Sequence, residues 1–415
     1  MNLDVLVVGA GPAGLSAAVE LRRLGVRSVV VADREAEPGG IPRHSWHTGY
    51  GLRDLHRLMA GPAYARALTG AAVAAGVSLR PGTTVTGWSA APDGPGFAVT
   101  VVSARGPETV HAAAVLLATG CRERPRTARL IPGDRPAGVM TTGELQQRVY
   151  LGGERVPGRA LVVGAEHVSF SAAVTLAHAG ARVVALVTEQ ERQQSYAAFR
   201  LGAALRWRVP VWTWTAVRRV AGHGRLAGVD VADVRTGATR FVPCDTLVFS
   251  GDWIPDHDLA RMAGLVMDPG TRGPAVDTTL ATSAAGVFAA GNLVHAAETA
   301  DVAALGGRHA ARGIVARLRR GPAPQPVRLP VTAEPPLRWI APNLVCPGGP
   351  APPRGRFILR SDVFARLARI EVWQGGRRLA TGISFRVIPD RPVRLGASWT
   401  GRADPEAGPL TVRLA

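Results

Sequence analysis

The sequence contains no lysine, and all 49 of its basic residues are arginine. Lysine Schiff-base chemistry, covalent attachment of pyridoxal phosphate and a Walker-type phosphate loop are therefore excluded. Against 31 acidic residues the formal net charge is +18. The arginines are nevertheless scattered along a chain rich in alanine, glycine and proline, which fits a coding bias better than a binding surface. We therefore expect no nucleic-acid partner.

Cysteine is almost as scarce. Cys121, Cys244 and Cys346 are each more than a hundred residues apart, and no C-x-x-C pair occurs. A local redox disulfide and a cysteine-rich iron–sulfur or zinc site are excluded by this spacing. We predict three buried or half-buried thiols and no metal site.

Long apolar runs are also missing. Hydrophobic residues make up 47% of the chain, but no run is long and glycine-free enough to span a membrane. A strand pattern begins almost at the first residue and leaves no room for a signal peptide, so we expect a cytoplasmic protein. The length of 415 residues predicts two or three domains, each with its own core.

The first forty residues carry the strongest positive pattern. The run Asp4 to Val8 predicts a buried parallel strand. Gly9, Gly11 and Gly14 follow at G-x-G-x-x-G spacing, and residues 15–24 predict a helix. Strand, glycines and helix in this register are typical of a dinucleotide-binding turn.

Each part of this turn has a physical role. Gly9 permits the tight turn, Gly11 lets a pyrophosphate approach the backbone, and Gly14 lets helix and strand pack closely. A second strand, 26–32, ends in an acid that can accept hydrogen bonds from the ribose hydroxyls. The residues predicted to bind the dinucleotide here are Gly9, Gly11, Pro12, Ala13, Gly14, Asp33 and Arg34.

The same architecture repeats about 155 residues later, with predicted strands at 159–164 and 182–187 and a helix at 171–179. The turn differs where phosphate would bind, because Glu166 and Ser169 stand at the second and third glycine positions. Serine costs only some closeness between helix and strand. A carboxylate at the second position adds bulk and repulsion. The sequence therefore makes NAD(P) binding doubtful.

The rest of the chain gives the domain organisation. We predict an α/β fold of two Rossmann-like, three-layer dinucleotide-binding domains, the second inserted in the first, plus a small C-terminal β domain. Helices are expected at 196–205 and 299–319, and six prolines mark a stiff linker. The predicted boundaries are 1–126 and 249–320 for the first domain, 127–248 for the second, 321–336 for the linker and 337–415 for the β domain.

Three segments together resemble the two-domain flavoproteins related to thioredoxin reductase: the opening turn, Val115-Leu-Leu-Ala-Thr-Gly120, and Thr282-Ser-Ala-Ala-Gly-Val-Phe-Ala-Ala-Gly-Asn292. The resemblance implies that the first domain binds FAD. It also implies that the closing helix points its positive end at the flavin pyrimidine ring. Further FAD-binding residues implied in this way are Gly40, Ile41, Thr119, Gly120, Gly291, Asn292, Thr299, Ala300 and Asp301.

Four shorter motifs look like the FAD subunit of heteromeric bacterial amine dehydrogenases, a branch that includes opine oxidases, hydroxyproline and sarcosine dehydrogenases and hydrogen cyanide synthase. They are Gly39-Gly-Ile-Pro-Arg-His44, Gly61-Pro-Ala-Tyr-Ala-Arg66, Gly120-Cys-Arg-Glu-Arg-Pro125 and Thr141-Thr-Gly143. This resemblance implies oxidation of a C–N bond in an amine or amino-acid-like substrate. It also implies a partner flavoprotein or iron–sulfur subunit. The cysteine-ligated module that some members carry near the C-terminus is absent.

His44 and His47, with Arg43 beside them, are the catalytic candidates. A histidine there can act as a base, or can position a substrate carboxylate with Arg43 as counter-charge. The alternative, which we favour, is that both histidines bind loop carbonyls and shape the loop.

Three functions remain open. The chain is an FAD-dependent dehydrogenase whose second domain has lost tight NAD(P) binding, a relay or non-catalytic subunit that needs a partner dehydrogenase, or a single-component NAD(P)H-dependent flavin oxidoreductase. We predict that the chain is not a disulfide reductase, because the stretch near residues 140–143 has no cysteine to take electrons from the flavin.

Overall fold

The computed structural model describes residues 2–91, 95–196, 209–321 and 326–415. The chain forms two compact units. The first comprises Met1–Arg43, Thr48–Cys121 and Pro255–Ala415, and the second His44–His47 and Arg122–Ile254. The predicted helix over 196–205 lies outside the described residues from 197 onward, as do residues 322–325 of the predicted linker.

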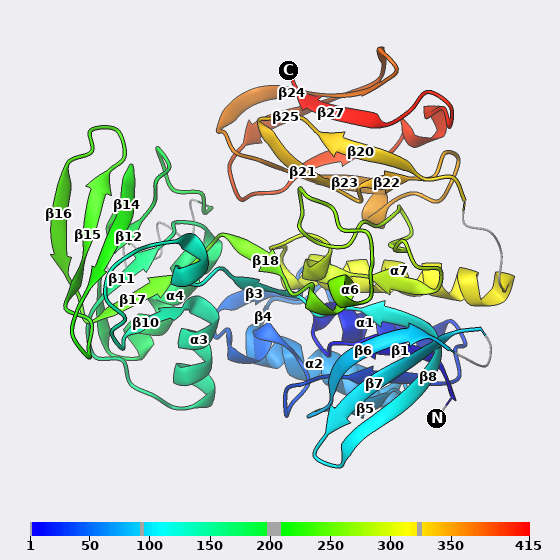
Figure 1. Ribbon diagram of the computed structural model, residues 1–415, viewed down its shortest axis with the longest axis horizontal. Coiled ribbons are helices and arrows are strands. Elements are labelled where there is room, and N and C mark those ends of the chain that lie inside the picture. The colour runs from blue at the N-terminus through cyan, green and yellow to red at the C-terminus, as the bar shows by residue number, and fades with distance from the viewer. Residues whose placement is uncertain (1, 92–94, 197–208, 322–325) are drawn as a thin grey trace. The chain divides into compact units, whose positions relative to one another are not determined.

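A seven-stranded sheet forms the centre of the first unit (Figure 1). Its parallel part has the order β5-β2-β1-β8-β19, and β7 and β6 extend it as an antiparallel ribbon along β8. The strands are β1 (Asn2–Val8), β2 (Val29–Ala32), β5 (Ser78–Arg80), β6 (Thr84–Ala90), β7 (Phe97–Ser103), β8 (Gly106–Leu117) and β19 (Val287–Ala289), with a separate short pair β3 (Thr48–Tyr50) and β4 (Met59–Ala60). The central strands are continuous apolar runs because both faces of the sheet are covered.

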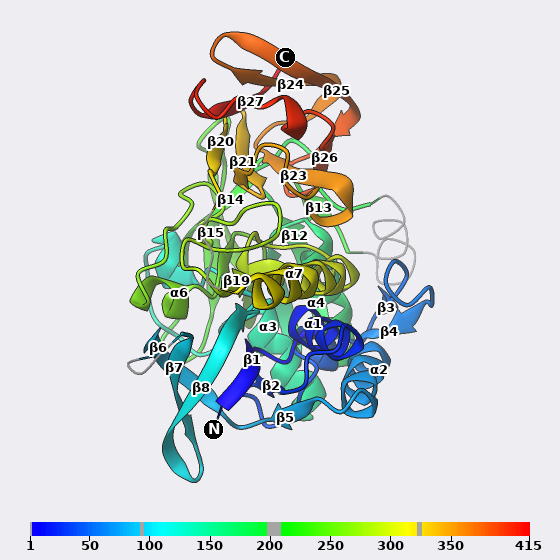
Figure 2. The same ribbon diagram turned by 90° about the vertical axis from the view of Figure 1, so that its right-hand side faces the viewer.

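Two helices cross closely over this sheet. They are α1 (Pro12–Arg23) and α7 (Ala300–Arg320), which lie side by side in Figure 2. Gly307 makes the approach possible, because a Cβ atom there would lie 2.0 Å from the Ala13 carbonyl oxygen. The other helices of this unit are α2 (Gly61–Ala74) and α6 (Asp258–Met262). Helix α2 begins at the Gly61-Pro62 pair, where proline is tolerated in the first turn.

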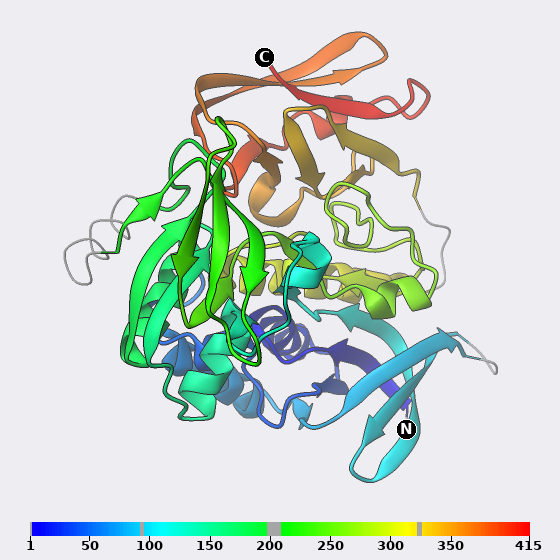
Figure 3. The same ribbon diagram turned by 60° about the vertical axis from the view of Figure 1, so that its left-hand side comes forward.

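The second unit has its own parallel sheet, with the order β10-β17-β11-β12-β13, and a three-stranded antiparallel sheet, β14-β15-β16 (Figure 3). Its core consists of aliphatic side chains of β11, β12 and β17 packed on α4 and on the antiparallel sheet. The elements are β10 (Val139–Thr141), α3 (Thr142–Gln146), β11 (Gly158–Val163), α4 (His167–His178), β12 (Ala181–Val187), β13 (Val211–Trp212), β14 (Thr215–Ala221), β15 (Gly228–Asp233), β16 (Thr239–Pro243) and β17 (Thr246–Phe249). Strands β9 (Cys121–Glu123) and β18 (Trp253–Pro255) pair where the chain leaves and re-enters the first unit.

The C-terminal residues form two β-sheets around a separate core in which Trp399 packs on Phe357, with the ring centroids 4.9 Å apart. The sheet orders are β22-β20-β27-β24-β25 and β21-β23-β26. The strands are β20 (Leu329–Ala333), β21 (Leu337–Ala341), β22 (Leu344–Val345), β23 (Arg356–Ser361), β24 (Ala365–Gln374), β25 (Arg377–Val387), β26 (Val393–Gly396) and β27 (Leu410–Leu414). The predicted fold class, including the small β domain, is confirmed.

One strand lies where the sequence predicted a linker. β20 falls within 321–336 and pairs with both β22 and β27. Pro330 is tolerated there because it is the second residue of the strand, beside the two-residue strand β22. The proline-rich segment 321–336 therefore contains the first strand of the β domain as well as the connection that leads to it.

Buried polar contacts join the β domain to the nucleotide fold of the first unit. The Asn343 side-chain oxygen accepts a hydrogen bond of 2.8 Å from the Val276 N–H. Arg328 forms an ion pair of 2.9 Å with the buried Asp277. No helix within the described residues is long and apolar enough to cross a membrane.

The α1–α7 crossing gives a matched test of the fold. Gly307→Ala forces a methyl group into the Ala13 carbonyl, so we expect the free energy of unfolding to fall by about 1–3 kcal/mol, as for other overpacked sites. Gly306→Ala is the control, because its nearest neighbour would be 3.8 Å away and alanine favours the helix. Denaturant unfolding of both variants measures the difference. Equal stabilities would contradict the packing argument.

Candidate functional site

The turn between β1 and α1 has the geometry that its glycines predict. Gly9 has φ of +107°, and a Cβ atom there would lie 2.4 Å from the Ala118 carbonyl oxygen. A Cβ atom on Gly14 would lie 1.9 Å from the Gly9 carbonyl oxygen. Gly11 differs, because nothing lies within 4 Å of its Cβ position. The first and third glycines therefore serve packing, and the second leaves open space.

The N-terminus of α1 fits the phosphates of a dinucleotide. Gly11 is its N-cap, no side chain caps it, and no acidic residue lies in the first turn. The amides of Ala13 and Gly14 belong to the first turn, where helical N–H groups have no partner within the helix. Such amides, with the positive end of the helix dipole, bind anionic phosphates.

The predicted ribose and adenosine residues lie around the same turn. Asp33 accepts hydrogen bonds from the N–H groups of Ala10 and Glu35, so part of its carboxylate already holds the backbone. Arg34 forms an exposed ion pair of 3.3 Å with Asp256. The Thr119 hydroxyl donates to the Asp256 carbonyl at 2.7 Å.

The later cofactor residues also gather here. Gly40 approaches the turn so closely that a Cβ atom on it would lie 2.9 Å from the Gly11 Cα. Ile41 is 54% exposed beside it, and Gly120 has φ of +81°. Gly291 lies against α1, with its Cβ position 2.7 Å from the Ala13 side chain. The structure thus brings all six segments that carry the predicted FAD residues into one unit.

Asn292 and Asp301 are tied into the protein. The Asn292 side-chain amide accepts from the Glu298 N–H at 2.9 Å and donates to the Glu298 carbonyl at 3.2 Å, which closes the loop between them. One N–H and one oxygen lone pair remain for a ligand. Asp301, only 1% exposed, pairs with Arg53 at 2.9 Å and accepts from the Val302 N–H. Thr299 is the N-cap of α7, and Ala300 is the first helical residue.

The catalytic candidates lie on and after a short 3-10 helix, η1 (Ile41–His44). The Arg43 guanidinium lies near the carboxylates of Glu35 and Glu37, at 3.8 and 3.5 Å. His44 is buried, and a ring nitrogen of His47 lies 3.1 Å from the Ser45 hydroxyl. Their catalytic roles stay predictions.

The second nucleotide turn supplies its own anion. Glu166 is the N-cap of α4, and its carboxylate accepts from the N–H groups of Val168 and Ser169, the latter at 3.1 Å. It also accepts from the hydroxyls of Ser169, at 2.6 Å, and Ser250. The side chain is buried. A carboxylate of the protein therefore occupies the position that a pyrophosphate takes at such a helix.

A second carboxylate lies close to Glu166. Glu123 accepts a hydrogen bond of 3.1 Å from the Gly143 N–H. Burial raises the pKa of Glu123 to about 7 with a contribution from the negative charge of Glu166, while the Gly143 hydrogen bond opposes both. Glu123 therefore titrates near neutral pH.

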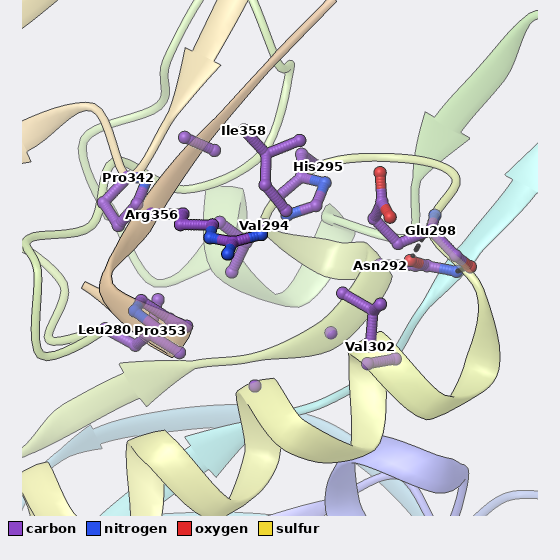
Figure 4. A pocket seen from close by; sticks show the side chains of 14 residues that line it. Leu280, Asn292, Val294, His295, Glu298, Val302, Pro342, Pro353, Arg356 and Ile358 are labelled. Carbon is purple, nitrogen blue, oxygen red and sulfur yellow. Dashed lines mark hydrogen bonds between the residues drawn. The ribbon is translucent and has the colours of Figure 1, made fainter. Parts of the chain in front are cut away.

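A pocket with about 460 Å³ of space, open to solvent, lies between α7 and the β domain (Figure 4). Most of its wall is apolar, and four polar side chains reach it: Asn292, His295, Glu298 and Arg356. Burial lowers the pKa of His295 to about 3, with a contribution from the charge of Arg360, so the imidazole is neutral at pH 7. Burial raises the pKa of Glu298, although its ion pair with Arg360 opposes this.

Comparison with known proteins assigns the family. Residues 3–307 match the model of the pyridine nucleotide-disulphide oxidoreductases. The chain belongs to this family. It is an FAD-dependent oxidoreductase, as the sequence predicted. Three quarters of the chain, 76%, also aligns with 98% of the thioredoxin reductase of T. acidophilum at a TM-score of 0.64 and 23% identity, which supports the fold alone.

Curated relatives of this oxidoreductase include ferredoxin reductases and subunits of amine oxidases. A ferredoxin–NADP reductase of Salinispora tropica is 32% identical over 70% of the chain and 86% of its own length. A component of the opine oxidase of Agrobacterium tumefaciens is 28% identical over 76% of the chain and 66% of its own length. The alpha chain of the sarcosine oxidase of a Corynebacterium species is 30% identical over 83% of the chain, which spans only 36% of that relative.

Several polar residues of the oxidoreductase were missed from the sequence. The motif around Tyr64 was noted, but not the buried hydrogen bond of 2.6 Å from its hydroxyl to Asp54. His295 and Arg356 were not predicted to face one pocket. The alternating pattern of the strand Arg356–Ser361 was the available signal, although it does not show which surface the strand covers.

The two helix N-termini predict opposite effects of exchanging their turn residues. Gly11→Glu puts a carboxylate at the open turn, where it can cap α1 as Glu166 caps α4. We expect the variant to fold but to lose FAD, which absorbance of the purified protein measures. Gly70→Ala serves as the control, because nothing lies near its Cβ position and it lies within helix α2. A Gly11→Glu protein that keeps FAD would contradict this model of the turn.

In the reverse exchange, Glu166→Gly removes the cap and frees the amides of Val168 and Ser169. Glycine is tolerated at an N-cap, so a loss of only about 1 kcal/mol is expected. Inorganic pyrophosphate should then raise the melting temperature of the variant and not that of the parent protein, because only the variant binds it. A shift of equal size in both would show that Glu166 does not occupy the phosphate position.

Glu123 predicts a pH dependence of stability. Its pKa is about 7 in the folded protein and 4.5 in the unfolded reference, so the folded state binds the extra proton between these values. The free energy of unfolding should therefore fall as the pH rises from about 4.5 to about 7. Glu123→Gln should flatten this slope in denaturant titrations across the range. An unchanged slope would show that another group is responsible.

Proposed function

We propose that this protein is a dehydrogenase, or the FAD subunit of one, that oxidises a C–N bond of an amine or amino-acid-like substrate. FAD supplies the oxidising chemistry when bound, by accepting a hydride at N5. The protein provides the dinucleotide cradle at α1 and the pocket beside Asn292.

The proposal depends above all on Glu166. Its carboxylate takes the helix N-terminus that a nicotinamide dinucleotide needs, so NAD(P)H is disfavoured as the electron donor. Disulfides are disfavoured as electron acceptors as well. The segment β10–α3, where a reductase of this shape has its cysteine pair, contains none, and burial raises the pKa of Cys244 to about 12. The flavin then needs an electron donor other than NAD(P)H and an electron acceptor other than a disulfide.

The relatives support an amine as that substrate. Two of them are named as subunits of an opine oxidase and of a sarcosine oxidase. The pocket wall is compatible with an amine, because burial keeps the pKa of His295 at about 3 and its imidazole therefore stays neutral. A neutral imidazole can accept a hydrogen bond from a substrate amine or ammonium group.

Two other functions have specific support. A relay subunit that needs a partner dehydrogenase is favoured by the names of these relatives, which are subunits. A single-component NAD(P)H-dependent oxidoreductase is favoured by the ferredoxin–NADP reductase relative. This last function requires Glu166 to leave the turn.

Anaerobic reduction of the FAD-loaded chain separates the three functions. We expect N-methylglycine, proline or an opine to bleach the flavin, and NADH and NADPH at micromolar concentration to leave it oxidised. The absorbance of the flavin is the measurement. Rapid bleaching by NADPH would establish the reductase instead.

If neither kind of donor reduces the flavin, the isolated chain is not a dehydrogenase by itself. Repeating the assay with the protein products of neighbouring genes then tests the relay function. Reduction that appears only with a co-purified partner would support it.

A further inference from the structure

Strand β23 of the β domain directs alternate side chains to opposite sides. Phe357 and Leu359 are fully buried in the core of the β domain. Arg356, Ile358 and Arg360 share the other face, because side chains alternate along a strand. This face covers the loop between Asn292 and α7, where Arg356 and Ile358 line the pocket.

Arg360 forms an ion pair with an acidic residue of that loop. It pairs with Glu298 at 3.0 Å and donates to the Ala297 carbonyl at 2.9 Å, and both charged side chains are about 5% exposed. Its guanidinium also lies over Trp339, 5.4 Å from the ring centroid. A buried pair with this geometry compensates both charges.

Arg356 has no such partner. Its guanidinium points into the pocket (Figure 4) and forms no ion pair or side-chain hydrogen bond with any residue that the structure describes. Arg394 lies diagonally opposite on β26, since Ile358 pairs with Arg394 and Arg356 with Gly396. Arg394 likewise forms no ion pair or side-chain hydrogen bond with any described residue, although its positive charge helps to lower the pKa of Glu298.

Arg354 and Arg53 add to the same positive region. Burial lowers the pKa of Arg354, and the charges of Arg394, Arg356 and Arg53 lower it further. The opposing charge is that of Asp301, which Arg53 already neutralises at 2.9 Å. Arg354, Arg356 and Arg394 are exposed, and none of them forms an ion pair with an acid within the described residues. A bound anion would offset the repulsion among these three charges.

Two buried nitrogen atoms on the pocket wall and on the neighbouring strand lack a hydrogen-bond partner within the described residues. They are Nδ1 of His295, on the pocket wall, and one terminal nitrogen of Arg360. Buried polar atoms are nearly always paired, so each needs a ligand or water. A planar carboxylate matches the fork of an arginine, and the aliphatic and proline side chains of the pocket fit an apolar body.

We propose that this pocket binds the carboxylate of the amino-acid-like substrate, with Arg356 as its principal partner and Arg394 and Arg354 beside it. The assignment rests on the proposed function and makes it more specific. The C-terminal β domain is then part of the substrate site, and amines without a carboxylate are poor ligands. Phosphate is the competing oxyanion, but the largely apolar wall favours the less strongly hydrated carboxylate.

Binding to the FAD-loaded full chain tests the proposal, and acetate and succinate test it without turnover because they have no C–N bond to oxidise. The probes are acetate, succinate, N-methylglycine and L-proline, with dimethylamine and pyrrolidine as amines that lack the carboxylate and inorganic phosphate as the competing anion. Calorimetry and melting temperature are the readouts. We expect carboxylates to bind, and Arg356→Gln to weaken them about tenfold or more, as for loss of a charged hydrogen bond. Arg356→Lys should give an intermediate affinity.

Arg386→Gln is the matched control, because it removes the same charge from an exposed position on the β24–β25 hairpin. It should leave carboxylate affinity unchanged. The proposal is overturned if no carboxylate binds, if Arg356→Gln binds as the parent protein does, or if phosphate binds more tightly than every carboxylate.

The same samples keep this proposal separate from the proposed function. Carboxylates that bind through Arg356 without any amino acid reducing the flavin would leave the anion site standing and refute the dehydrogenase. If amino acids reduce the flavin equally fast in Arg356→Gln, the dehydrogenase is supported and the anion site is refuted.

Discussion

The N–H groups at the start of an α-helix need a negative or polar partner, and this chain meets that need in two different ways. At α1 the cap is Gly11, which brings no side chain, so the amides are left for a phosphate. At α4 the cap is Glu166, whose carboxylate binds the same kind of amides from within the protein. One architecture thus leaves its helix amides open in the first unit, where a dinucleotide is predicted to bind, and capped by a carboxylate in the second.

The closed turn explains why the fold does not decide the chemistry. The chain belongs to the pyridine nucleotide-disulphide oxidoreductases and has their paired sheets and helices. The two features behind that family name are nevertheless altered, because an acid lies at the second turn and no cysteine lies in β10 or α3. Function therefore has to be inferred from the side chains at each site.

One loop of the nucleotide fold links the β domain to the predicted flavin contact. Asn292 holds the Glu298 backbone, and Glu298 pairs with Arg360 of β23. The loop that follows the predicted flavin contact is therefore held from both sides. The same strand places Arg356 in the pocket beside it. A domain that carries no catalytic motif thereby contributes charge to the wall of a candidate substrate site.

Local patterns were sufficient for much of this protein. Gly9, Gly11 and Gly14 predicted the geometry of the first turn, and Glu166 predicted its altered copy, because turn geometry depends on residues a few positions apart. The pairing of Arg360 with Glu298, and the position of Arg356 in the pocket, could not be predicted. They depend on which face of β23 meets a loop about sixty residues earlier in the chain, and alternation along a strand does not contain that information.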